Sequence, residues 1–219
     1  MNQLKLLGGS GNIFPTMVIK EPILKKIYSF EDLRGSPKLD RSSFERFLKL
    51  YFQKQLVAKV KSEPADAHSS HEHIVKVVGS TFDKLVLDST KDVLIEFYAP
   101  WCEKCQHFEK VMQRLGEVFC DSKSLRIATM DATKNDVPTG VIAGMNGYPN
   151  IFLFPAGNHK KPIEYKGSKN AFDIVRFVQE NSRFKIKLPN EVLAKLKTEK
   201  ERSKKESEHN HSKGSHTEL

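Results

Sequence analysis

The sequence has only three cysteines among its 219 residues, at positions 102, 105 and 120. A structural zinc site usually takes four ligands, and the second ligand pair that would complete a site with Cys102 and Cys105 is absent. Cys120 lies roughly 22 Å beyond Cys105 on a continuous helix, too far to share a metal or a disulfide. Zinc is left as a remote alternative, and no metal or organic cofactor is expected. Cys120 itself is predicted to be a small core residue.

Long apolar stretches are also missing, so no segment is expected to span a membrane. The first eight residues have no apolar core of the kind that a secretory signal peptide needs. A net charge of +9 could suggest nucleic-acid binding, but residues 62–182 contain 14 basic and 16 acidic side chains. The basic excess lies in the flanks, where it is usually solvated surface. Neither a nucleic-acid nor a membrane partner is expected.

The spacing of apolar residues along the chain changes at Cys102. Residues Val93–Tyr98 form a nearly continuous apolar run, typical of a strand covered on both faces. After Cys102, apolar residues recur at steps of three and four up to Phe119, as on one face of a helix. Glu96 interrupts the strand, and a carboxyl group buried there is expected to have a raised pKa. The sequence therefore predicts that Cys102 begins a helix directly after a buried strand.

This position indicates a chemical function for the two cysteines. Unpaired backbone N–H groups at a helix N-terminus favour an anion, so Cys102 is expected to be an exposed, ionised nucleophile. Cys105 lies one turn deeper on the same side and within disulfide reach, as a shielded resolving thiol. Glu96 is expected to exchange protons with Cys105. Together they predict a centre for thiol–disulfide exchange.

The residues from Glu96 to Cys105 read Glu-Phe-Tyr-Ala-Pro-Trp-Cys-x-x-Cys. This run resembles the active-site motif of the protein disulfide isomerases, a branch of the thioredoxin fold. The resemblance implies an α/β thioredoxin fold, a central mixed sheet flanked by helices, over residues 73–183. Strands are expected at 74–78, 93–99, 125–130, 151–154 and 163–165, and helices at 82–87, 106–119, 137–145 and 171–180.

The resemblance also implies residues that orient the substrate and tune the site. Pro149 matches a proline that is cis in the family, and the backbone of Tyr148 before it is free to pair with an extended substrate. Lys169 matches an arginine and can still lend positive charge, without the fork of donors.

Several motif positions depart from the family. Trp101 is shared, but Glu103 and Lys104 replace the usual Gly-His between the cysteines. Thr129 stands where relatives often have a lysine that pairs with the buried glutamate. Glu96 is therefore expected to lack a counter-ion and to be mostly protonated.

The pattern of residues 1–56 predicts the second, C-terminal half of another, non-catalytic thioredoxin-like domain. Strands are expected at 16–19 and 26–30, followed by a helix with a capping-box pattern at Ser42 and Glu45. A half-domain leaves a sheet edge open and a helix face uncovered. The sequence is therefore expected to be the C-terminal part of a longer protein.

Two segments flank the catalytic domain. Residues 57–72, with a proline and a cluster of serines and histidines, are expected to be a linker. Residues 184–219 are expected to be a charged, largely disordered tail with one or two helical turns. The tail ends in a tetrapeptide that resembles the retrieval signal of the endoplasmic reticulum: His216, Thr217, Glu218 and Leu219.

These features predict a thiol–disulfide oxidoreductase or isomerase of the endoplasmic-reticulum lumen, where disulfide chemistry is possible. Its expected partners are cysteine-containing folding secretory proteins, a retrieval receptor, and glutathione or a lumenal sulfhydryl oxidase. The alternative is a chaperone-like or adaptor binding module whose dithiol is little used.

Overall fold

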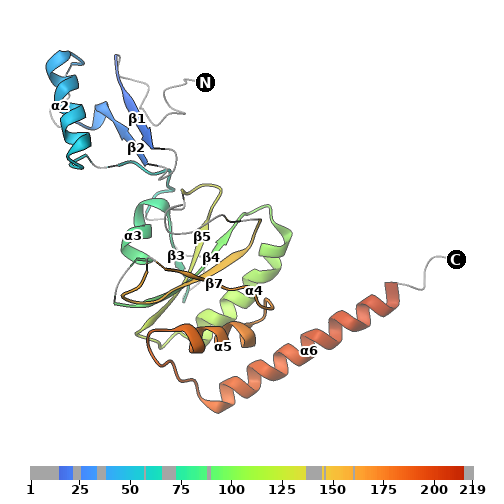
Figure 1. Ribbon diagram of the computed structural model, residues 1–219. Helices are drawn as coiled ribbons and strands as arrows, with labels where there is room; N and C mark the ends of the chain where they lie inside the picture. The colour runs from blue at the N-terminus through green and yellow to red at the C-terminus, as the bar shows by residue number, and fades with distance from the viewer. Residues whose placement is uncertain are drawn as a thin grey trace. The chain divides into compact units, whose positions relative to one another are not determined.

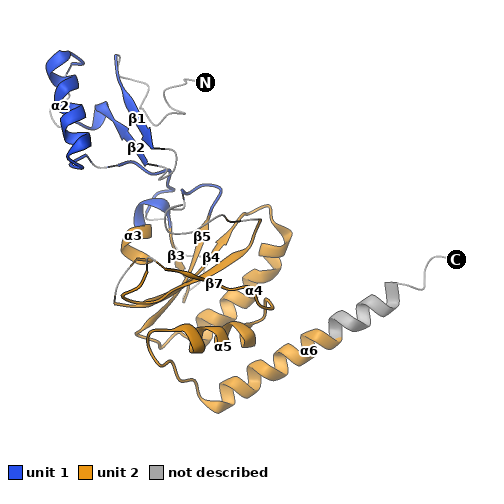
Figure 2. Cartoon of the chain, in the orientation of Figure 1, with its two compact units in different colours: residues 1–65, 78–81, 132–144 blue, residues 66–77, 82–131, 145–219 orange. Residues whose placement is uncertain are grey.

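The computed structural model describes residues 15–21, 26–33, 38–56, 58–65, 73–87, 90–136, 145, 147–159 and 161–214, with side chains as far as residue 205. The chain divides into two compact units (Figure 2). Unit 1 comprises residues 1–65, 78–81 and 132–144, and unit 2 comprises the remainder. No helix within the described ranges is both long and apolar enough to cross a membrane. Nearly all of the expected helix at 137–145, and the tetrapeptide at 216–219, lie outside the described residues.

Unit 1 contains a two-stranded antiparallel sheet with a helix packed against it (Figure 1). Phe30, Leu33 and Phe47 are buried in the core that the sheet and helix share. The expected order of strand, strand and helix is present, whereas the assignment of residues 1–56 to half of a thioredoxin-like domain stays a prediction. The elements are β1 (Val18–Glu21), β2 (Lys26–Ser29), the 3-10 helix η1 (Phe30–Asp32) and α2 (Arg41–Phe52).

The capping box of α2 differs from the one predicted at Ser42 and Glu45. Asp40 is the N-cap, and its carboxylate accepts a hydrogen bond from the backbone N–H of Ser43 at 2.8 Å. The hydroxyl of Ser43 accepts one in return from the backbone N–H of Asp40 at 2.9 Å. An aspartate at this place accepts a hydrogen bond from a backbone N–H that has no partner within the helix. Its negative charge is also stabilised by the positive end of the helix dipole. The Ser42 and Glu45 assignment was therefore wrong by two residues.

Part of the predicted linker is held by hydrogen bonds within unit 1. Lys59 and Ile27 exchange both of their backbone hydrogen bonds, so β2 is paired on its outer edge at that point. Asn135, which is buried, accepts hydrogen bonds from the backbone N–H groups of Glu63 and Gly79. Its amide donates to the Glu63 carboxylate at 2.9 Å. The sequence did not indicate these contacts, because they join residues far apart in the chain.

Unit 2 contains a five-stranded mixed sheet in the order β3-β5-β4-β6-β7, with helices against it (Figure 1). β4 is parallel to β5 and antiparallel to β6. The predicted central mixed sheet flanked by helices is therefore confirmed. The elements are β3 (Val75–Lys76), η2 (Gly79–Thr81, assigned to unit 1), α3 (Phe82–Leu85), β4 (Asp92–Tyr98), α4 (Glu103–Val118), β5 (Leu125–Asp131), β6 (Asn150–Phe154), β7 (Ile163–Glu164), α5 (Ala171–Asn181) and α6 (Asn190–Gly214).

Strand β4 is buried on both faces, and its side chains alternate between them. Phe97 contacts the ring of Phe82 from α3, with ring centroids 6.3 Å apart. Leu94 lies in the core cluster that includes Met112 of α4. Glu96 is two residues from Leu94, so it too faces α4. The alternation of the strand thus places a carboxyl group beneath the first turns of that helix.

Helix α6 occupies residues Asn190–Gly214, whereas only one or two helical turns were expected in a charged, largely disordered tail. Leu196 is 1% exposed and belongs to the core of unit 2. The guanidinium group of Arg114 on α4 donates two hydrogen bonds to the Glu199 carboxylate, at 3.2 and 3.1 Å. Tertiary packing of this kind stabilises a helix that its own sequence would leave marginal.

Replacing Leu196 with alanine is expected to lower the free energy of unfolding by about 2 to 4 kcal/mol, because it removes a buried side chain. Urea unfolding of the purified chain measures this. The exposed neighbouring change Lys195→Ala serves as the control and is expected to stay within about 0.5 kcal/mol. Equal stability of the two variants would mean that α6 is not docked in solution.

Candidate active site

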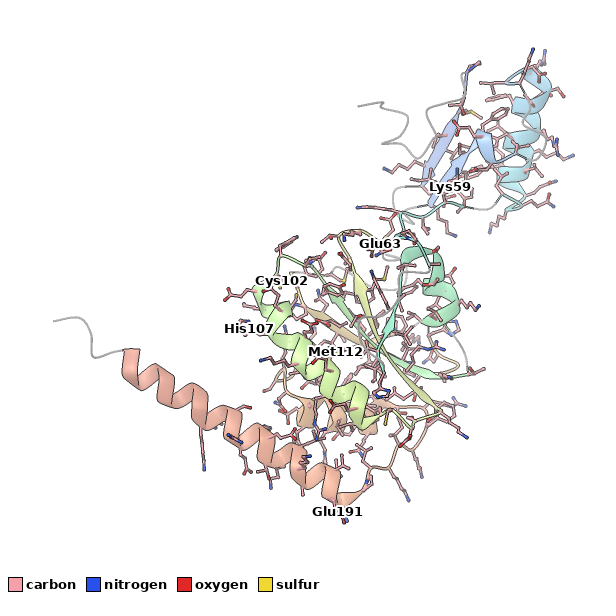
Figure 3. The ribbon with its side chains drawn as sticks, turned by 180° about the vertical axis from the view of Figure 1, so that it is seen from behind. Lys59, Glu63, Cys102, His107, Met112 and Glu191 are labelled. Carbon is pink, nitrogen blue, oxygen red and sulfur yellow. The ribbon has the colours of Figure 1, made fainter. Side chains whose placement is uncertain are left out.

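Cys102 is the N-cap residue of α4, directly after β4 (Figure 3). Its sulfur accepts a hydrogen bond from the backbone N–H of Cys105 at 3.3 Å. A sulfur at this position lies at the positive end of the helix dipole. The sequence-based prediction that this cysteine begins the helix is confirmed.

The exposure of Cys102 differs from the prediction, whereas Cys105 is shielded as expected. Cys102 is only 9% exposed and Cys105 is 5% exposed, so the first thiol is buried rather than open. Ala99 and the partly buried ring of Tyr148 pack against this pair. Trp101 is 74% exposed, and its ring meets that of Tyr148 edge to face at 6.0 Å. The surface beside the dithiol is therefore aromatic.

The segment before β6 approaches the nucleophile from the other side. The peptide bond between Tyr148 and Pro149 is cis, as the resemblance implied. The thiol of Cys102 donates a hydrogen bond to the Tyr148 carbonyl oxygen at 3.5 Å. The ammonium group of Lys169 donates to the Pro149 carbonyl at 3.2 Å. Three segments far apart in the sequence, at Cys102, at Tyr148 and Pro149, and at Lys169, thus come together.

Cys105 has the properties of a thiol that needs help to ionise. Burial, followed by its hydrogen bond with Cys102, raises the pKa of the Cys105 thiol to about 12. At neutral pH the Cys105 thiolate therefore rarely forms spontaneously. Any reaction that uses this sulfur as a nucleophile therefore gains from a nearby base.

Glu96 is a buried carboxyl group close enough to Cys105 to act on it through its charge. Burial, and then the charge of Glu109, raise the pKa of the Glu96 carboxyl to about 8, while Lys169 acts in the opposite direction. Glu96 is 4% exposed, and its Oε1 atom is buried without a hydrogen-bond partner among the described residues. It lies opposite Thr129 on β5, as the resemblance implied. Lys169 lowers the Glu96 pKa through its charge, but burial has the larger effect, so the direction of the shift agrees with the expectation that Glu96 is mostly protonated.

A cavity of about 190 Å³ connects these groups. Cys105, Glu96 and Thr129 line it together with Gln106 and Glu109 of α4. Gln106 and Glu109 are exposed at the surface of the helix. Glu109 was not among the predicted site residues, although its spacing of four residues from Cys105 places both on one helix face.

The remaining candidates take no part in the site. Cys120 is exposed rather than buried, because α4 ends at Val118 and Cys120 follows in a turn. The prediction of a core residue there was wrong. Within the described ranges, no group of three or more His, Cys, Asp or Glu side chains could hold a metal ion.

Comparison with known proteins assigns the domain. The thioredoxin family model matches residues 73–180. A protein disulfide-isomerase of Arthroderma benhamiae is 33% identical over 177 residues, which cover 79% of this chain and 32% of the relative. Protein disulfide-isomerase A3 of Gallus gallus is 37% identical over 161 residues, covering 74% of this chain and 31% of the relative.

Residues 73–180 are therefore a thioredoxin domain of the protein disulfide isomerase family. Among solved structures, the J-Trx1 fragment of ERdj5 aligns with a TM-score of 0.44 and 22% identity, over 51% of this chain and 53% of that one. The chain spans about a third of the length of the curated disulfide isomerases described above.

Proposed function

We propose that the chain is a thiol–disulfide oxidoreductase or isomerase that forms, breaks and rearranges disulfides in folding secretory proteins. The observation that carries this proposal is the dithiol at the start of α4, where Cys102 caps the helix and Cys105 lies one turn behind it. Both cysteines are free thiols in the structure. This chemistry transfers electrons between sulfur atoms and needs neither a metal nor an organic cofactor.

The reaction proceeds through a mixed disulfide. The Cys102 thiolate attacks one sulfur of a substrate disulfide, and the other substrate sulfur leaves as a thiolate. Glu96 in its ionised form then takes the proton of Cys105, and the Cys105 thiolate attacks the Cys102 sulfur. The second substrate thiolate leaves, so the substrate is reduced by two electrons while Cys102 and Cys105 form a disulfide. The same steps in reverse oxidise a substrate dithiol.

Residues around the dithiol orient the substrate. The cis-proline segment at Tyr148 and Pro149 offers backbone groups to an extended substrate next to Cys102. Trp101 presents an exposed apolar ring at the same place. Lys169, bonded to the Pro149 carbonyl, acts as a modulator of charge near Glu96. Glu103 and Lys104 lie between the cysteines, at the exposed first turn of α4.

The partners and location follow from this chemistry. We infer a place in the lumen of the endoplasmic reticulum, an oxidising compartment where such chemistry is used. Glutathione or a lumenal sulfhydryl oxidase would exchange electrons with the dithiol, and a retrieval receptor would bind residues 216–219. Neither a nucleic acid nor a membrane is needed as a partner.

Refolding of scrambled ribonuclease in a glutathione buffer tests the proposal. The chain is expected to speed recovery of ribonuclease activity well above the buffer rate, and alkylation of its thiols is expected to remove the effect. Equal recovery with the native and the alkylated chain would refute the exchange activity and favour a binding module.

Cys120 allows a clean version of this test. Because Cys120 is exposed and outside the site, Cys120→Ser is expected to keep the wild-type refolding rate within about twofold. In that variant an alkylating reagent can reach only the dithiol. A large loss of activity in Cys120→Ser before alkylation would show that the third thiol takes part in exchange.

A further inference from the structure

The cavity beside Cys105 joins a buried carboxyl group to the surface. Its inner wall is formed by Glu96, Cys105 and Thr129, and its outer part by Gln106 and Glu109. Its volume of about 190 Å³ leaves room for several water molecules. It is therefore a path along which protons can travel through water.

Glu96 needs such a path if it is to act repeatedly. In each catalytic cycle it accepts a proton from Cys105 and must later release or return one. The residue is 4% exposed, so it has little direct contact with bulk solvent. A proton that reaches Glu96 must therefore leave through the cavity or back to the thiol.

The lining offers few groups that could carry this proton. Glu109 and Cys105 face Glu96 from α4, and Lys169 acts on it from the loop before α5. Thr129 of β5 and Tyr98 of β4 also line the cavity, and their hydroxyl groups can relay a proton but cannot hold an extra one at neutral pH. The amide of Gln106 is not a useful base. Glu109 is the lining carboxylate that also reaches solvent.

We propose that Glu109 passes protons between solvent and Glu96 through the water of this cavity. The inference rests on the proposed exchange function. During substrate reduction the proton moves from the Cys105 sulfur to Glu96, then through water to the Glu109 carboxylate, and from there to the buffer. During substrate oxidation it moves in the opposite direction. Glu109 does not touch the reacting sulfurs. It acts through Glu96, whose proton it exchanges with solvent, and is therefore a positioning residue and not a catalytic one.

The test compares Glu109→Gln with the wild type in insulin reduction. In dilute, poorly buffering solution at pH 7, Glu109→Gln is expected to be about tenfold slower, because general acid–base relays contribute at least that much. Adding imidazole or acetate as a small proton carrier is expected to restore most of the rate, while the wild type changes little. Glu109→Asp, which keeps the carboxylate, is expected to stay near the wild-type rate.

Glu117→Gln is the matched control, since it removes one carboxylate from the same helix without touching the cavity. It is expected to react like the wild type with or without added carrier. A Glu109→Gln variant as fast as the wild type in dilute buffer would overturn the proposal. So would a slow variant that neither added carrier nor aspartate rescues, because that result indicates a structural role. Failure of the exchange function itself would appear separately, as an inactive wild type.

Discussion

Cys102→Ser is expected to reduce insulin reduction and ribonuclease refolding by at least about 10³-fold, as removal of an activated nucleophile does in other covalent enzymes. The sulfur removed is the one at the cap of α4, which accepts the Cys105 N–H and contacts the Tyr148 carbonyl. A serine hydroxyl at this place cannot ionise at neutral pH or bond to a substrate sulfur. The fold is expected to survive, because serine is an effective N-cap residue.

Cys105→Ser separates the two thiols by the product it leaves. Cys102 can still attack, but no second sulfur is present to resolve the mixed disulfide, so a covalent complex with the substrate is expected to accumulate. A non-reducing gel of the variant mixed with a disulfide-containing substrate measures this complex. Cys102→Ser is expected to form none. If the complex formed on Cys105 in the Cys102→Ser variant instead, the roles assigned to the two sulfurs would be reversed.

The start of α4 could be predicted because its signals are local. The change from a continuous apolar run to a helical period occurs within a few residues of Cys102, and the cap position follows from that change. The position of Glu96 on β4 was equally visible, since side chains on a strand alternate between its faces. Short stretches of sequence were therefore enough to predict the fold class of residues 73–183. They also predicted the positions of Cys102 and Glu96 in the site.

The predictions that proved wrong concern residues whose structure depends on contacts with distant parts of the sequence. Residues 190–205 have a weakly apolar sequence, and their helix is stabilised by partners on α4 and α5, such as Asp173, whose carboxylate lies 2.7 Å from the Lys200 ammonium. The burial of Cys102 depends on Tyr148, 46 residues later. Neither the spacing of apolar residues nor a short motif contains information about such long-range contacts.

Glu96→Gln is expected to slow turnover by about 10²-fold, the contribution typical of a positioned general base. Glutamine has nearly the same shape but cannot accept the proton of Cys105, whose own pKa of about 12 makes spontaneous ionisation rare. The first attack by Cys102 does not require this base. Single-turnover measurements should therefore show a normal rate of mixed-disulfide formation and a slow rate of resolution.

The same change is expected to stabilise the reduced protein at alkaline pH. Burial raises the pKa of Glu96 from its ordinary value of 4.5 to about 8 in the folded chain, so the folded state holds this proton more tightly. The stability associated with the protonated group is fully present below pH 4.5 and falls as the pH rises through 8. Relative to its value below pH 4.5, the free energy of unfolding of the wild type therefore falls by about 3 kcal/mol at pH 7 and by about 5 kcal/mol at pH 9. Glu96→Gln has no titrating group at this position and does not show this loss.

Urea unfolding at pH 5, 7 and 9 in the presence of a reductant measures the difference between the two proteins. All other titrating groups are shared, so their contributions cancel in that difference. Glu117→Gln, a change of the same kind at an exposed ion pair, is expected to give a small difference that varies little with pH. A difference for Glu96→Gln that stayed constant from pH 5 to pH 9 would contradict a proton held by the buried carboxyl group. Greater alkaline stability together with slower resolution would mean that the chain keeps a destabilising buried acid because its proton chemistry requires it.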